Sequence, residues 1–405
     1  MFRILQISNQ QDLKQIMRDI RVDPYGIKIM LPKADTYLIK MNSISNITAN
    51  ILKQEMLSLG GDVAIARDAL TGKTKNTDCL IIGNLSQLTR LNHKLNKQPF
   101  GLNRLGQDLF RGIRNYQRNG FILEAGRYKL NLGRRSYVMG IINLTPDSFS
   151  GDGLYRIRDT ANHRVQPGDI IDAAEKMVND GADILDAGGE STRPGARPVS
   201  IKEELKRTIP LIKLLAKKIK IPISIDTHKP EVARQALDNG ASMVNDISGL
   251  RNPEMAKIIA KYKAAVVIMH MKGTPGTMQQ NPQYSFLIEE IIGYLAKAIE
   301  KAESFGISKE KIIIDPGLGF GKLLTHNLEI LRRLAEFKVL GVPILVGPSR
   351  KSFIGNILNS LPQERTLGTV SACVLAVRNG AKLVRVHDVK EVKQALKVLD
   401  AIEKI

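Results

Sequence analysis

The chain has 405 residues, of which 43% are hydrophobic and 25% charged, with 33 Gly and 17 Pro. This is the composition of a globular protein, and it excludes a collagen-like, low-complexity or wholly disordered chain. A net charge of +20 leaves nucleic acid, an anionic membrane or a phosphorylated small molecule open as partners. We find no apolar run long enough for a bilayer and no leader sequence. The two distant cysteines, Cys79 and Cys373, favour a reducing, cytoplasmic location over a disulfide framework.

Residues 1–119 are expected to form a small α/β domain whose role the sequence does not define. Apolar runs predict strands at 37–41, 62–66 and 79–83, and helical spacing predicts helices near 46–59 and 104–118. Four arginines lie close to one face of the last helix: Arg104, Arg111, Arg114 and Arg118. A solvated face or a domain contact explains them more simply than an anion-binding stripe.

Residues 120–405 are predicted to form a (β/α)8 TIM barrel, introduced by a hairpin at 121–133 that plugs its bottom. Short apolar, β-branched runs alternate there with amphipathic helical segments, which favours parallel strands covered on both faces. The predicted strands are 138–145, 183–189, 222–227, 243–248, 264–270, 312–317, 343–349 and 383–388. A doubly wound open sheet is the alternative, but eight regular units favour a closed barrel.

Polar residues stand at, or just after, the C-terminal end of nearly every predicted strand. They are Asn143, Glu190, Asp226, Asn245, Asp246, His270, Asp315, Ser349, Arg350, Arg385 and His387. One or two such residues would be ordinary caps of the following helices. Because the C-terminal strand ends of a barrel share one rim, the full set predicts a single active site there.

Three acceptor or amide side chains, Asp226, Asn245 and Asp315, are expected to converge in the barrel mouth. Together they suit a planar heterocycle rich in N–H donors, because a carboxylate facing two donors makes a charge-assisted contact. The loops 143–153 and 188–198 contain Pro, Gly, Ser and Asp, and are expected to cover this mouth.

A cationic group is expected after the seventh and eighth strands, at the usual phosphate position of such a barrel. It comprises Ser349, Arg350, Lys351, Arg385 and His387. Asn143, on the neighbouring first strand, could ligate Mg²⁺ through its side-chain oxygen, since Mg²⁺ takes few protein ligands and completes its shell with water and phosphate.

These motifs resemble those of the dihydropteroate synthase family, in order and spacing, over about 134–405. The matching runs are MGIINLTPDSFSGDG, GGESTRPGA, SIDTHKPEVA, VNDISG, MHMKGTPGTMQ, DPGLGFGK, GPSRKSFIG and VRVHDV. The resemblance implies condensation of 6-hydroxymethyl-7,8-dihydropterin diphosphate with 4-aminobenzoate to 7,8-dihydropteroate and pyrophosphate, in folate biosynthesis. It also implies Mg²⁺, a cytoplasmic homodimer, and neither a nucleic-acid nor a membrane partner.

The resemblance further assigns roles to individual residues. The pterin would be held by Asp226, Asn245, Asp315 and Lys351, in a slot lined by Met269 and Phe320. Mg²⁺ would be held by Asn143, the diphosphate by Asn143, Arg385, His387 and Asp152, and catalysis would rest on Arg385, His387 and Lys351. The aminobenzoate site and the covering loops would be bordered by Thr192, Arg193, Pro194, Phe149 and Ser352.

The sequence departs from the family pattern in several places, two of which concern the first loop. It has FSGDG where the family commonly has FSDGG, so the loop aspartate stands one position later, at Asp152, and 155–168 look like an insertion.

Two other classes of function stay open. A pterin-binding methyltransferase would keep the acids but would not need a diphosphate grip, and a nucleic-acid binder is suggested by the charge alone. The identity of the arylamine is not defined by the sequence.

Overall fold

The computed structural model describes residues 2–7, 10–99, 101–144, 167–191 and 198–403. It divides into two compact units, Met1–Arg114 and Asn115–Ile405. Five of the predicted site residues lie outside the described residues: Phe149, Asp152, Thr192, Arg193 and Pro194. The same holds for most of the predicted insertion at 155–168.

The first unit is a three-stranded antiparallel sheet with helices, which confirms the predicted small α/β region. Its strands are β1 (Thr36–Ser45), β2 (Asp62–Ile65) and β3 (Asn76–Asn84), in the order β1-β3-β2. The helices are α1 (Gln10–Asp19), α2 (Pro24–Ala34), α3 (Asn46–Ser58), α4 (Arg67–Thr71), α5 (Leu85–Leu95) and α6 (Leu102–Gln117), which continues into the second unit. Leu52, Ile81 and Leu91 lie in one apolar core of this unit.

The second unit is a closed barrel of eight parallel strands, as predicted. The strands are β6 (Tyr137–Asn143), β7 (Ile184–Gly188), β8 (Ile223–Asp226), β9 (Met243–Asp246), β10 (Ala265–Met269), β11 (Ile312–Asp315), β12 (Leu345–Val346) and β13 (Leu383–Val386). Their order is β11-β10-β9-β8-β7-β6-β13-β12. A parallel bridge between Ile314 and Ile344 joins the two ends of this order and closes the ring.

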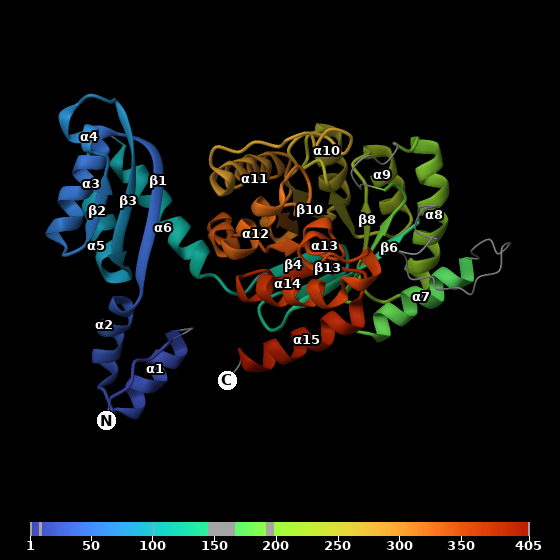
Figure 1. Ribbon diagram of the computed structural model, residues 1–405, viewed down its shortest axis with the longest axis horizontal. Coiled ribbons are helices and arrows are strands. Elements are labelled where there is room, and N and C mark those ends of the chain that lie inside the picture. Colours follow the sequence, from blue (N-terminus) through green and yellow to red (C-terminus); the bar gives the residue numbers. More distant parts are fainter. Residues whose placement is uncertain (1, 8–9, 100, 145–166, 192–197, 404–405) are drawn as a thin grey trace. The chain divides into compact units, whose positions relative to one another are not determined.

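Helices surround these strands (Figure 1) and bury an apolar layer between themselves and the barrel wall. They are α7 (Pro167–Asn179), α8 (Ile201–Lys218), α9 (Pro230–Asp238), α10 (Pro253–Tyr262), α11 (Leu287–Ser304), α12 (Leu324–Arg332), α13 (Ser352–Leu358), α14 (Thr366–Arg378) and α15 (Val389–Ile402). Short 3-10 turns lie at η2 (Lys309–Lys311), η3 (Leu334–Leu340) and η4 (Pro362–Glu364). Among the described residues, every helix is too short or too polar to cross a bilayer.

A β-hairpin fills the N-terminal end of the barrel. It consists of β4 (Ile122–Ala125) and β5 (Tyr128–Asn131), and it turns at Gly126, whose φ of 58° favours glycine. Leu123 packs in one buried cluster with residues from the first half of the barrel strands, including Met139 and Val267. Because apolar side chains fill this end, the polar side chains of the barrel interior are expected near the C-terminal rim.

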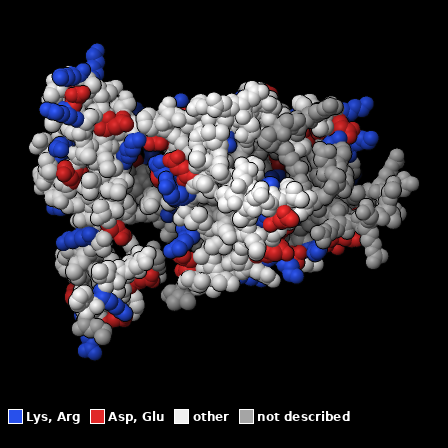
Figure 2. Space-filling model, viewed as in Figure 1, with Lys and Arg blue, Asp and Glu red and all other residues white. Residues whose placement is uncertain are grey.

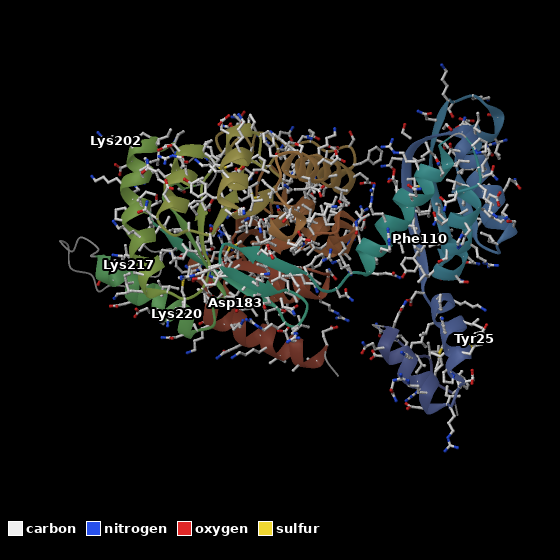
Figure 3. All side chains as sticks on the ribbon, turned by 180° about the vertical axis from the view of Figure 1, so that it is seen from behind. Tyr25, Phe110, Asp183, Lys202, Lys217 and Lys220 are labelled. Carbon is white, nitrogen blue, oxygen red and sulfur yellow. The ribbon has the colours of Figure 1, made fainter. Side chains whose placement is uncertain are left out.

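Ion pairs also stabilise the N-terminal end. Asp183, which precedes β7 (Figure 3), accepts hydrogen bonds from Arg135 at 2.6 Å and from Lys393 at 2.8 Å. Elsewhere the charged side chains of both signs are mixed over the face shown in Figure 2. This mixture gives that face no single basic surface to which the net charge could be assigned.

Candidate active site

The predicted strand-end residues lie side by side on the C-terminal rim. In the sheet register, Gly188 of β7 stands opposite Asn143 of β6 on one side and Asp226 of β8 on the other. Asp226 is in turn opposite Asn245 of β9, and Asp315 of β11 is opposite Met269 of β10. The barrel therefore carries residues that are far apart in the chain to one end of the molecule.

Arg385 is the centre of a buried charge cluster in this mouth. Its Nε donates to Asp186 Oδ2 at 2.6 Å, and its Nη2 donates to Asp226 Oδ2 at 2.7 Å. Asn245 Nδ2 donates to the same Asp186 oxygen at 3.0 Å. One guanidinium thus forms ion pairs with two carboxylates, and the Asp186 carboxylate binds both this guanidinium and the Asn245 amide.

The second oxygen of each carboxylate has no hydrogen-bond partner among the described residues: Asp186 Oδ1 and Asp226 Oδ1 are both buried and unpaired. Buried polar atoms are nearly always paired in folded proteins, so such acceptors point to a ligand or to water. Burial raises the pKa of the Asp226 carboxyl to about 7; Arg385 opposes this shift and Asp186 adds to it.

Asp315, Lys351 and Phe320 form the neighbouring part of the mouth. Lys351 Nζ donates to the Leu318 carbonyl and lies 4.7 Å from the centre of the Phe320 ring. Burial raises the pKa of Asp315, with Lys351 acting against the shift, and burial lowers the pKa of Lys351 to about 8. The charge of Lys351 interacts with Asp315, Arg385 and Asp226, so this group lies close to the Arg385 cluster.

The floor of this space is apolar. Met269 is buried with Ile247, Met271 and Met278, and Phe320 packs against them. Thioether and aromatic side chains make a polarizable surface that suits a flat ring. This apolar cluster adjoins the polar group, since Met269 is opposite Asp315 in the sheet register and Phe320 lies under Lys351 Nζ.

Asn143, His387 and Ser349 form a third group on the same rim. His387 Nε2 is 3.3 Å from Asn143 Nδ2, and His387 Nδ1 is 2.9 Å from Ser349 Oγ. Since the amide nitrogen of Asn143 faces His387, its carbonyl oxygen is directed elsewhere. A neutral oxygen of this kind is a ligand that Mg²⁺ accepts.

Some predicted residues have other partners. Arg350 donates through Nη2 to Asp388 at 2.5 Å, so its guanidinium forms an ion pair and does not extend the cationic group of Arg385. Asp246 accepts the backbone N–H groups of Ser248 and Leu250, both at 2.8 Å, and acts as a turn cap. Ser352 is exposed at the first position of α13.

Two buried residues of this region were not predicted from the sequence. Asp186 is fully buried inside β7, and Lys322, in the loop after β11, is 3% exposed. The signal for Asp186 was available, since a carboxylate within an otherwise apolar strand needs a partner. Lys322 carried no comparable signal, because a lysine in a Gly-rich loop is ordinarily solvated.

Comparison with known proteins identifies the family. The family model described as "Pterin binding enzyme" matches residues 139–387. The dihydropteroate synthase of Synechocystis sp. is 49% identical over 282 residues, which is 69% of this chain and 94% of that protein. The dihydropteroate synthase of Xanthomonas albilineans, solved with 4-aminobenzoic acid, superposes with a TM-score of 0.64 at 40% identity, covering 71% of this chain and 99% of that one.

A protein of Halobacterium salinarum matches nearly the whole length of this chain. A probable bifunctional folylpolyglutamate synthase/dihydropteroate synthase of that organism is 37% identical over 399 residues, 98% of this chain and 46% of that protein. Since it spans 399 of the 405 residues, this alignment reaches into residues 1–119. The chain belongs to the dihydropteroate synthase family of pterin-binding enzymes, a family of folate biosynthesis.

Proposed function

We propose that this chain condenses 6-hydroxymethyl-7,8-dihydropterin diphosphate with 4-aminobenzoate, giving 7,8-dihydropteroate and pyrophosphate. The observation that carries the proposal is the buried cluster in which Arg385 joins Asp186 and Asp226, beside Lys351 and Asp315. It offers acceptors for the N–H edge of a pterin and cations for a diphosphate within one mouth.

The pterin is held between acids and an apolar floor. Asp226, Asn245 and Asp315 present acceptors and an amide, while Met269 and Phe320 pack against the flat ring. The unpaired Asp226 Oδ1 is free of any hydrogen bond to the described residues and accepts from the pterin. Thr192, Arg193, Pro194, Phe149 and Ser352 are assigned to the aminobenzoate side by family resemblance.

The reaction is substitution at the pterin methylene carbon. The nitrogen lone pair of aminobenzoate is delocalised into its ring, so leaving-group departure runs ahead of attack and the pterin ring delocalises the cationic carbon. Arg385 and His387 then stabilise the charge that develops on the departing diphosphate, with Lys351 nearby. The carboxylates around the ring favour the electron-poor pterin.

Mg²⁺ is proposed as the metal, and when bound it supplies charge neutralisation on the diphosphate. The described residues contain no group of three His, Cys, Asp or Glu that could hold a metal. The amide oxygen of Asn143 would hold Mg²⁺ as a protein ligand, since this metal takes few ligands from proteins. Asp152 is proposed as a second contact to the diphosphate.

Replacing Asn143 by alanine is expected to raise the Mg²⁺ concentration for half-maximal activity by roughly tenfold, because one direct oxygen ligand is lost. Titration of pyrophosphate release against Mg²⁺ measures this. Asn143→Asp keeps an oxygen at the same position, and we expect it to need less metal than Asn143→Ala. Identical metal curves for the two variants and the parent chain would remove Asn143 from the metal site.

A cytoplasmic homodimer is proposed as the working form. On α13 and α14, and between them, large apolar side chains are exposed: Ile357 at 55%, Leu361 at 66% and Leu367 at 80%. Large apolar side chains exposed on neighbouring elements support a protein contact there, and a second copy is the partner expected from the family. Sedimentation of the full chain tests this, and a single-chain mass would contradict it.

The activity is tested with the full chain, the pterin diphosphate, Mg²⁺ and 4-aminobenzoate, by following pyrophosphate release. We propose that 120–405 hold the complete site and that 1–119 form a separate domain. Pyrophosphate release is therefore expected from the full chain and also after deletion of 1–119. If the full chain releases no pyrophosphate when both substrates are present, the proposed function is wrong. If the full chain is active but the chain lacking 1–119 is not, the proposed domain division is wrong.

A further inference from the structure

The backbone of the loop after β11 is held by an unbroken series of hydrogen bonds. Gly317, Gly319 and Gly321 have φ values of 72°, 78° and 64°, so the isolated segment would be flexible. Five consecutive carbonyls nevertheless each accept a hydrogen bond: Gly317 from Phe320 N, Leu318 from Lys351, Gly319 from Gln279, Phe320 from Lys322, and Gly321 from Tyr284. Three of these donors, Lys351, Gln279 and Tyr284, come from other segments, and two, Phe320 N and Lys322, belong to the loop itself.

One of these donors, Lys322, is a buried amine with no part in the proposed chemistry. Its Nζ donates to the Phe320 carbonyl at 3.0 Å and lies 2.9 Å from His270 Nδ1 and 3.5 Å from the His270 carbonyl. None of the ion pairs of the described residues includes Lys322. A buried amine without a carboxylate in contact costs free energy of folding, so core packing alone does not account for it.

His270 is a rigid partner for this lysine. Its side chain is 5% exposed and meets the Tyr294 ring edge-on, with the ring centres 5.0 Å apart. Burial lowers the pKa of His270 to about 2, and the charge of Lys322 adds to this shift, so the imidazole stays neutral. The lysine therefore joins the end of β10 to the loop after β11.

The loop that Lys322 holds carries two parts of the pterin site. Phe320, whose carbonyl accepts from Lys322, packs against the apolar floor and lies beneath Lys351 Nζ. Asp315 Oδ1 accepts from Gly317 N at 2.7 Å, so the start of the loop also orients this carboxylate. A shift of the loop would displace the ring and the acid together.

We propose that Lys322 is a positioning residue for the pterin: it fixes Phe320 and Asp315 through its bonds to the Phe320 carbonyl and to His270. The inference rests on the proposed function, since it takes the pterin to lie on this floor. Lys322 has no contact with Arg385, His387 or Asn143 among the described hydrogen bonds, so the diphosphate side of the site does not depend on it.

The test separates the two halves of the substrate. Calorimetry with 6-hydroxymethyl-7,8-dihydropterin, which lacks the diphosphate, reports the pterin half, and pyrophosphate with Mg²⁺ reports the other. For Lys322→Met in the full chain we expect pterin affinity to fall at least tenfold, while pyrophosphate affinity changes less than twofold. A general loss of structure would lower both affinities, and that outcome, like two unchanged affinities, would overturn the proposal.

Lys393→Met is the matched control, because Lys393 is also a buried lysine but pairs with Asp183 at the opposite end of the barrel. We expect this control to leave both affinities unchanged. Lys322→Gln, which can still donate to the Phe320 carbonyl, is expected to fall between the parent chain and Lys322→Met. If neither Lys322 variant folds, the residue serves folding and the proposal is wrong. Failure of the parent chain itself to bind the pterin would instead contradict the proposed function.

Discussion

Replacing Arg385 by methionine is expected to lower turnover by roughly 100-fold or more, the scale seen when a donor to developing negative charge is removed. The guanidinium now shares its charge between Asp186 and Asp226. Without it, Asp186 and Asp226 lose the cation they share, and a carboxylate that stays ionised repels the departing diphosphate. The substitution therefore removes an attraction and exposes a repulsion at the same position.

The same substitution is expected to lower the free energy of unfolding by about 3–5 kcal/mol, because it leaves buried charges without their partner. Turnover should therefore be measured well below the unfolding temperature of the variant, with the two effects recorded separately. Arg135→Met is the control, since Arg135 also pairs with a carboxylate, Asp183, at the other end of the barrel. If Arg385→Met and Arg135→Met have the same turnover, Arg385 has no role in the chemical step.

The barrel could be predicted because its signal is local and repeated. Each strand is an apolar run followed by a polar residue, and parallel strands bring those residues to one rim without any knowledge of distant contacts. Asn143, Asp226 and Asn245 are neighbours in the register for this reason alone. The placement of strand ends thus followed from periodicity and topology.

The ion-pair partners of the individual arginines could not be predicted in the same way. Arg350 and Asp388 are 38 positions apart, and Arg385 and Asp186 are 199 positions apart. Nothing in the local sequence distinguishes an arginine that will meet a carboxylate from one that will meet a phosphate. The sequence therefore placed Arg350 with the cations of the site, whereas the fold pairs it with Asp388.

Asp186 shows a second limit. It lies two residues before the end of β7, opposite Ser224, and its side chain enters the barrel one layer below the rim. A search restricted to strand ends overlooks this layer, although Asp186 contacts both Arg385 and Asn245. A buried acid inside an apolar strand marks the site as clearly as one at its end.

Pterin binding is expected to weaken as the pH falls from about 8 to about 6, because Asp226 must be ionised to accept the N–H donors of the ring. Burial raises the pKa of this carboxyl from 3.8 to about 7 in the ligand-free chain. Below that pKa the proton competes with the pterin, and affinity falls by up to about tenfold per pH unit.

The contribution of Asp226 to folding stability is expected to change with pH in the opposite direction to pterin affinity, increasing as the pH falls. A raised pKa means that the folded chain favours the neutral carboxyl, so the contribution of Asp226 to stability is present below its ordinary value of 3.8 and is lost as the pH rises towards about 7. Near neutral pH the ionised Asp226 therefore lowers the stability of the parent chain, but it provides a charged hydrogen-bond acceptor in the barrel mouth.

Asp226→Asn separates these effects, since the amide keeps the shape of the side chain and does not titrate. We expect its pterin affinity to be lower than that of the parent chain at about pH 8 and to vary little with pH between about 6 and 8. Calorimetric titrations with 6-hydroxymethyl-7,8-dihydropterin across this range measure both curves. If the two curves are parallel, the titrating group is not Asp226, and Asp315, whose pKa burial also raises, becomes the candidate.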